Sequence, residues 1–172
     1  KLPKTWLENE LWNLIRINPK ELPTGEAEII PSFEYLRLGH KGLKAYRAIL
    51  SLKQNESMQV YTIQYPDLNR NLIIYFENKF PFSIEKWEET YVSGFGQGAK
   101  TMTTTATKMK RIKTAYWSQN KNSDIVLREA LGLDETSSEC AFAVGNAQLN
   151  MVTANKTSSF FILSSLDESI NN

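Results

Sequence analysis

Hydrophobic positions near the start of the chain repeat with the period of an α-helix. The repeat, at i, i+4, i+7 and i+8, falls on Leu7, Leu11, Leu14 and Ile15. Thr5 stands three residues before Glu8, the spacing of a capping box, and Pro19 stops the pattern. The sequence therefore predicts an N-terminal helix over Thr5–Asn18.

From Gly25 onward the pattern changes to the two-residue period of β-strands. Apolar side chains alternate with polar ones from residue 46 to 53, and further strands are predicted within residues 58–66, 70–80, 82–92 and 100–114. Threonine, a good strand former, dominates the last of these segments. Residues 26–38 also have strand character, but Pro31 must break that strand or place it at an edge of the sheet.

The pattern changes again after the last predicted strand. Ser123 is a suitable N-cap for a short helix over Asp124–Leu131, and Gly132 follows where a left-handed terminus is usual. From residue 134 the chain is rich in Ser, Asn and Thr without clean periodicity. We therefore expect one α+β, mainly β domain over residues 1–133: a curved antiparallel meander of about six strands, with an N-terminal helix and a short C-terminal helix. Residues 134–172 are expected to form a loosely ordered tail.

Composition limits the possible functions more than it identifies one. The 172 residues include 20 basic and 19 acidic side chains, a net charge of +1, so no global field favours nucleic acid or an anionic membrane. No apolar run approaches the roughly 20 residues of a membrane-spanning helix. Cys140 and His40 are the only residues of their kinds, too few for an intramolecular disulfide or a zinc site, and we predict no cofactor and no metal.

A glycine-rich loop between two predicted strands contains a possible nucleotide-binding motif. Gly94, Gly96 and Ala99 match G-x-G-x-x-A, a dinucleotide-binding variant. That motif needs a helix after the loop, so that backbone amides meet the pyrophosphate. Here a threonine-rich strand follows, so the glycines predict a wide hairpin turn instead.

Charged residues give weaker indications. If the strand that starts at residue 100 continues, the basic residues divide between its two faces as solvated charges: Lys108, Lys110, Arg111 and Lys113. Glu85 and Glu89 lie four residues apart on one strand, about 13 Å, too far for joint glycoside hydrolysis. A ladder pairing these carboxylates with nearby lysines is the simpler interpretation. His40, between two glycines, is expected in a solvated turn, and no catalytic residue is predicted.

Aromatic residues leave two alternatives open. They can fill a core between sheet and helices. If the sheet curls, they can also line an apolar pocket on its concave face, with Tyr61, Tyr65, Tyr75 and Trp87 as the candidate ligand-binding residues.

Five blocks of the sequence resemble the C-terminal half of uncharacterised proteins of Bacteroidetes, chiefly flavobacteria, that carry the automatic name "septum formation inhibitor Maf". The blocks are residues 7–25, 30–46, 61–76, 80–100 and 103–133. The resemblance covers roughly residues 2–133, and residues 134–172 depart from it, because members commonly end near Leu133. The Ser-x-Ser-Pro-Arg-Arg motif of the true Maf pyrophosphatases does not occur in this chain, so the resemblance carries over no catalytic residue.

The resemblance implies a cellular setting. Such proteins have a further N-terminal half preceded by an export signal, often of lipoprotein type. We therefore expect a mature product or fragment of an exported or lipid-anchored cell-envelope protein. The expected role is non-enzymatic, in binding an envelope partner protein or in assembly, with no nucleic acid and with membrane contact only through the parent's anchor. The alternative is a carrier of an apolar small molecule, and the third is an envelope hydrolase, which would need Glu88, His40 and a hydroxyl together in one cleft.

Overall fold

The computed structural model describes residues 4–55, 57–119 and 121–133. These residues belong to two compact units, which we describe separately: unit 1, residues 4–107, and unit 2, residues 108–133. The predicted tail over residues 134–172 lies outside the described residues.

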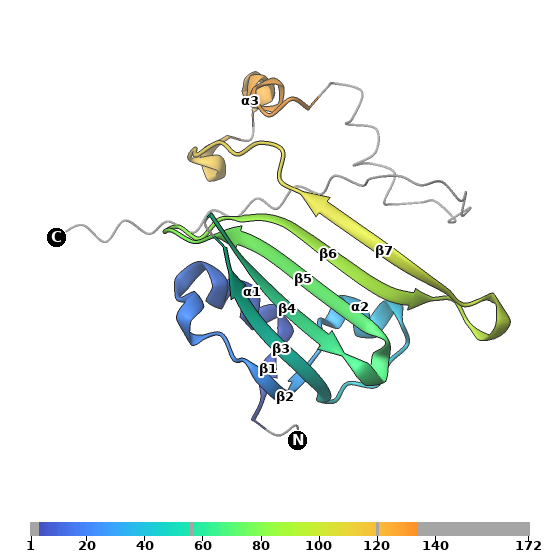
Figure 1. The fold of residues 1–172 in the computed structure, drawn as a ribbon. Helices are drawn as coiled ribbons and strands as arrows, with labels where there is room; N and C mark the ends of the chain where they lie inside the picture. The colour runs from blue at the N-terminus through green and yellow to red at the C-terminus, as the bar shows by residue number, and fades with distance from the viewer. Residues whose placement is uncertain (1–3, 56, 120, 134–172) are drawn as a thin grey trace. The chain divides into compact units, whose positions relative to one another are not determined.

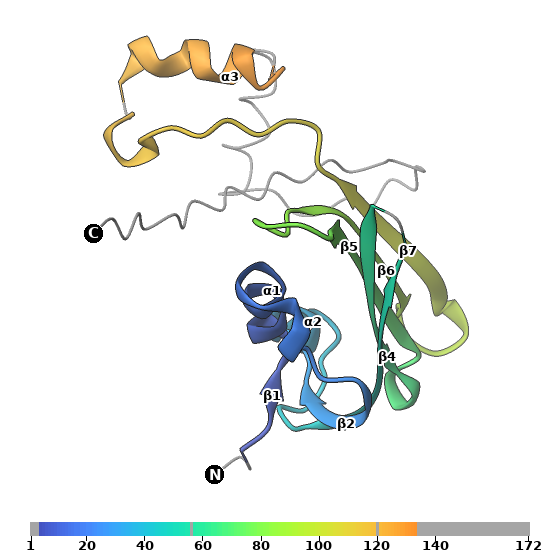
Figure 2. The ribbon, with the colours of Figure 1, turned by 60° about the vertical axis from the view of Figure 1, so that its left-hand side comes forward.

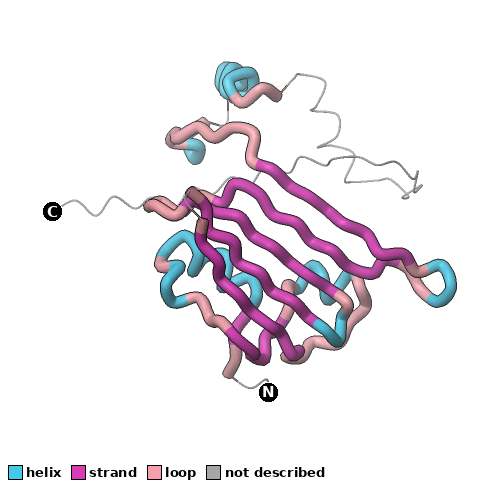
Figure 3. The backbone as a smooth tube through the Cα atoms, viewed as in Figure 1, coloured by secondary structure: helices cyan, strands magenta, loops and turns pink. Residues whose placement is uncertain are grey.

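Unit 1 is built on one sheet whose strands lie side by side in the order of the chain (Figures 1 and 3). The seven strands are β1 (Trp6–Leu7), β2 (Gly25–Ile30), β3 (Tyr46–Gln54), β4 (Met58–Tyr65), β5 (Arg70–Glu77), β6 (Ile84–Ser93) and β7 (Lys100–Thr107). Only β1 and β2 run parallel, and every other neighbouring pair is antiparallel. The predicted α+β, mainly β meander is confirmed, with one short strand more than expected.

Two helices of unit 1 lie on one face of the sheet (Figure 2). They are α1 (Glu8–Ile17) and α2 (Phe33–Leu38). Short 3₁₀ turns complete the unit: η1 (Pro19–Glu21), η2 (Pro66–Leu68) and η3 (Gly96–Gly98). The sheet thus has a helix-covered face and a second face, called the open face below, that no described element of unit 1 covers.

The core lies between α1 and the covered face. Every second residue of β4 and β5 is buried there: Tyr61, Ile63, Tyr65, Leu72, Ile74 and Phe76. Leu11 and Ile15 of α1, both fully buried, pack against them. Burial of these two helix side chains stabilises the unit by about 3–6 kcal/mol.

The predicted start of the first helix is wrong. Trp6 and Leu7 form strand β1 beside β2, and the Thr5 hydroxyl donates to the carbonyl of Glu28 instead of capping the helix. The helix begins at Glu8, whose side chain turns inward. Pairing with β2 therefore prevails over the local capping signal.

Pro31 ends β2, as the sequence indicates, but the residues that follow form a helix and not a strand. The Ser32 hydroxyl accepts a hydrogen bond from the Tyr35 backbone N–H at 3.2 Å and caps α2. A six-residue helix shows little periodicity in sequence, which explains the wrong prediction.

Unit 2 contains η4 (Tyr116–Ser118), η5 (Asn122–Ile125) and α3 (Val126–Ala130). The short C-terminal helix is confirmed, although its first turn is 3₁₀, and Gly132 has a φ of +74° as its left-handed position requires. The strand predicted to reach residue 114 ends at Thr107, so the basic residues 108–113 do not alternate along a strand. No helix among the described residues is long and apolar enough to span a membrane.

Candidate functional site

A buried ionic cluster joins α1 to the covered face of the sheet. Arg70, the first residue of β5, donates from Nη1 and Nη2 to the two carboxylate oxygens of Glu8 at 2.5 and 2.8 Å. The side chains of Arg70 and Glu8 are only 2% and 1% exposed. A bidentate pair of this kind fixes both the position and the rotation of the helix.

Three more side chains complete the ionic cluster. Glu89 of β6 accepts from Arg70 Nε at 2.6 Å, and the Tyr65 hydroxyl donates to Glu8 at 2.8 Å. The Tyr35 ring lies 4.3 Å from the Arg70 guanidinium carbon, a cation–π contact. Two carboxylates thus share one guanidinium.

Burial and charge shift the titration of this cluster. Burial by itself lowers the pKa of Arg70, but the hydrogen bonds and charges of Glu8 and Glu89 raise it above its usual value. Burial, with the charge of Glu8, raises the pKa of Tyr65. Both groups therefore keep their protons at neutral pH.

The cluster attaches α1 to the sheet, and its buried polar atoms are engaged in hydrogen bonds. Arg70 donates to both carboxylates, and among the described residues no buried side-chain nitrogen or oxygen lacks a hydrogen-bond partner. The sequence contains a signal for this ionic cluster that the predictions above did not use. Glu8 lies on the helix stripe of Leu11 and Ile15, and Arg70 lies at the period-two position before Leu72, so both charges fall on buried faces.

The open face carries a second, less buried charge cluster. Glu88 of β6 accepts from Lys86 at 2.6 Å and from the Tyr75 hydroxyl at 3.0 Å. The hydrogen bond from Lys86 lowers the pKa of Glu88, and the same bond raises the pKa of Lys86. Burial, with the hydrogen bond to Glu88, raises the pKa of Tyr75. The two charges neutralise each other.

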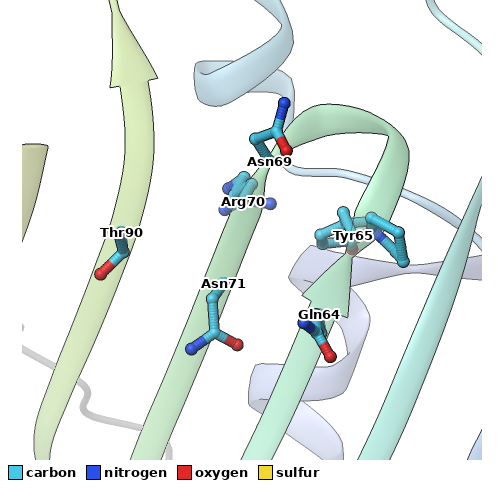
Figure 4. A pocket seen from close by; sticks show the side chains of 7 residues that line it. Gln64, Tyr65, Asn69, Arg70, Asn71 and Thr90 are labelled. Atoms are coloured by element: carbon cyan, nitrogen blue, oxygen red, sulfur yellow. The ribbon is translucent and has the colours of Figure 1, made fainter. Parts of the chain in front are cut away.

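A cavity with mainly polar walls lies near the η2 turn between β4 and β5. It has a volume of about 130 Å³. The residues that line it are Gln64, Tyr65, Pro66, Asn69, Arg70, Asn71 and Thr90 (Figure 4). A second cavity, of about 320 Å³, lies at the opposite end of these strands and is lined by Ser57, Glu77, Asn78 and Lys79.

The four predicted ligand-binding residues do not gather around either cavity. Tyr61 and Tyr65 are fully buried in the core, and Trp87 packs edge-on against Trp12 with 6.3 Å between ring centroids. Tyr75 stands on the open face, away from the other three. Tyr65 touches the 130 Å³ cavity, but the other three do not line it. Binding of an apolar ligand stays a prediction.

Of two further predictions from the sequence, one is confirmed and one is wrong. The glycine loop is the predicted hairpin between β6 and β7, with φ of +88° at Gly94 and +57° at Gly96. The pairing predicted for Glu89 with lysines is wrong, because the buried Arg70 takes that carboxylate.

His40 lies in the predicted turn, at a φ of +49°. Its ring lies beside that of Phe95, with 6.1 Å between the ring centroids. Phe95 lies beyond the end of β6, whereas Glu88 is five residues inside that strand, about 17 Å from its end at the usual rise. Among the described residues, no hydrogen bond or ion pair joins His40 to Glu88. Nor do the described residues contain a group of three or more His, Cys, Asp or Glu side chains that could hold a metal ion.

Comparisons of the chain with known protein families, with curated proteins and with solved structures find no match. The resemblance to the flavobacterial proteins stays a prediction.

Proposed function

We propose that unit 1 is a non-enzymatic binding domain that takes up an extended segment of a partner protein along the free edge of β7. The observation that supports this is the position of β7. It is the last strand of the sheet, and no strand within the described residues pairs with its outer edge. Every second backbone N–H and C=O of such a strand points outward and needs a hydrogen-bond partner.

The outer edge of β7 lacks most of the features that block strand addition. Its register with β6 runs through eight consecutive pairs without a bulge, from Lys100 opposite Ser93 to Thr107 opposite Lys86. β7 contains no proline, and its one charged residue, Lys100, is at its start. Five of its eight residues are threonines, which favour the extended backbone. An incoming segment therefore meets an unbroken, nearly neutral template.

The side chains of β7 determine which partner segments fit this edge. Thr101, Thr103, Thr105 and Thr107 share one face of the strand. Met102, Thr104 and Ala106 share the other, and Met102 is 48% exposed. A segment that alternates small polar with apolar residues matches these two rows.

The cell envelope is the proposed setting, on the side reached by export, with any lipid anchor on the parent protein. The support for this setting is the sequence resemblance alone. The partner is accordingly an envelope protein with an exposed or unfolded extended segment.

Site-specific photocrosslinking followed by hydrogen exchange tests the proposal. A benzophenone amino acid replaces Met102 of β7 in one variant of the parent protein. In the control variant it replaces Leu38 of α2, which is 72% exposed. We expect a defined protein adduct from position 102 and none of the same mass from position 38.

The purified complex is then compared with the free chain. In the free chain every second amide of β7, bonded to β6, exchanges slowly, and the outward amides exchange fast. The partner is expected to slow the outward amides. Equal adducts from both positions, or outward amides that keep their exchange rate in the complex, would refute strand addition.

A further inference from the structure

Four uncharged polar side chains form a row across the open face, here called the amide row. Gln64 of β4 lies opposite Asn71 of β5, Asn71 opposite Thr90 of β6, and Thr90 opposite Thr103 of β7. Figure 4 shows the first three side by side on neighbouring strands. At the usual strand spacing of about 4.8 Å the row is about 14 Å long and runs perpendicular to the strands.

The two amides of the row are available to a ligand. The structure shows no hydrogen bond for the side chains of Gln64 and Asn71 within the described part of the chain, whereas the Thr90 and Thr103 hydroxyls are bonded to each other at 3.0 Å. An amide presents two donors and one carbonyl acceptor, and a hydroxyl presents both roles. Such groups match a ligand with many hydroxyl groups, each of which can donate and accept a hydrogen bond, as on a hydroxylated ring.

The 130 Å³ cavity adjoins the row at Gln64, Asn71 and Thr90, on the side of the η2 turn. Asn69, in the turn at a φ of +48°, supplies a third amide to its wall, and Pro66 supplies an apolar surface. The volume equals that of about four water molecules. One edge of a sugar ring, with its hydroxyl groups, can enter the cavity while the rest of the ligand follows the row.

The charged side chains near the row are engaged in ion pairs, which disfavours charged ligands. The row itself contains no charged side chain. Arg70 lines the cavity, but its guanidinium is held by Glu8 and Glu89. On the same face Lys86 is paired with Glu88. The residues of the row and of the cavity wall therefore offer no uncommitted cation to an anion and no carboxylate to a cation.

We infer that the amide row and the adjoining cavity bind a neutral saccharide chain that lies across strands β4 to β7. The polar side chains orient the hydroxyl groups, and the lack of an uncommitted cation in the row and the cavity wall selects against phosphorylated or acidic sugars. This inference is independent of strand addition at β7, because it uses side chains of the open face and not the backbone of the sheet edge.

Amide NMR of the full 172-residue chain tests the inference directly, because side-chain NH₂ signals report on Gln64 and Asn71 themselves. The probes are cellotetraose, chitotetraose and maltotetraose at about 10 mM, enough to detect a Kd on the order of 1 mM. Inorganic phosphate at equal ionic strength is the charged comparison. We expect at least one saccharide, and not phosphate, to shift both NH₂ signals.

Variants then separate the row from the rest of the surface. Combined Gln64→Ala and Asn71→Ala replacement is expected to weaken binding about tenfold or more, since at least two hydrogen bonds are lost. Thr105→Val, on the same face one register position outside the row, is the matched control and should bind as the unchanged chain does. The inference is overturned if no saccharide of the panel shifts the two signals, if phosphate shifts them equally, or if the double variant binds undiminished.

Discussion

The buried ionic cluster makes a strong prediction about stability. Arg70→Met retains much of the side-chain volume but removes the guanidinium that Glu8 and Glu89 share, and Glu8 is 1% exposed. Breaking a buried pair by removing one partner costs about 3–5 kcal/mol, because the remaining charge stays desolvated. A domain of this size has about 5–15 kcal/mol of total stability, so the loss is a large share of it.

Urea denaturation followed by tryptophan fluorescence measures this loss. Trp12 of α1 and Trp87 of β6 are in edge-to-face contact, so their emission reports when the helix leaves the sheet. With a slope of about 1–2 kcal/mol per molar urea, the midpoint should fall by about 2 M or more. Arg47→Met is the control, since Arg47 pairs with Glu26 at an exposed site, and its midpoint should barely move.

Acidity provides a second check on the same variant. A buried carboxylate without its cation is most costly when ionised, so protonation relieves the penalty. The stability gap between Arg70→Met and the unchanged chain should therefore narrow from pH 7 towards about pH 4. A loss below about 1 kcal/mol at pH 7, or a gap that stays constant with pH, would refute the assignment of the cluster as the attachment of α1.

Three smaller changes test local features by the same denaturation assay. Ser32→Ala removes the cap of α2 and should cost about 1 kcal/mol, whereas Ser32→Asp should cost less. Gly94→Ala should cost about 1–2 kcal/mol, because φ is +88° there and a Cβ would lie 3.2 Å from the Gly98 carbonyl oxygen; no loss would contradict the hairpin geometry. The pKa of Glu88 is lowered mainly by its hydrogen bond from Lys86, so its contribution, under about 1 kcal/mol, is present above the unfolded pKa near 4.3 and lost as pH falls through the folded value. Glu88→Gln should therefore flatten the fall in stability between about pH 5 and pH 3, and an unchanged slope would contradict this.

Periodicity was sufficient to predict most strands of the sheet and the body of the first helix. Alternation along β4 and β5 identifies the buried residues one by one, because a strand with one covered face has a period of two. The ends of elements were less predictable. Thr5 and Glu8 have the spacing of a cap, yet both are used by contacts with residues far along the chain, Glu28 and Arg70.

The amide row could not be predicted because it depends on register between strands. Gln64, Asn71, Thr90 and Thr103 come together only when the hairpin turns have the lengths observed here, and a shift of one residue moves a side chain to the other face. The four predicted aromatic residues do not share one cavity for a related reason. Tyr61 and Tyr65 alternate with polar residues as core positions do, and a core is what they fill.

Thr103 separates the two proposed binding modes, because its hydroxyl belongs to the amide row while its backbone belongs to the β7 edge. Thr103→Val removes the hydroxyl but keeps a β-branched side chain, so the strand and its outward backbone groups are retained. Saccharide binding should weaken about two- to tenfold, the effect of one hydrogen bond, while the yield of the crosslinked adduct at position 102 stays the same. Loss of the adduct with unchanged saccharide binding would show that side chains, not backbone groups, hold the partner, and would contradict both proposals at once.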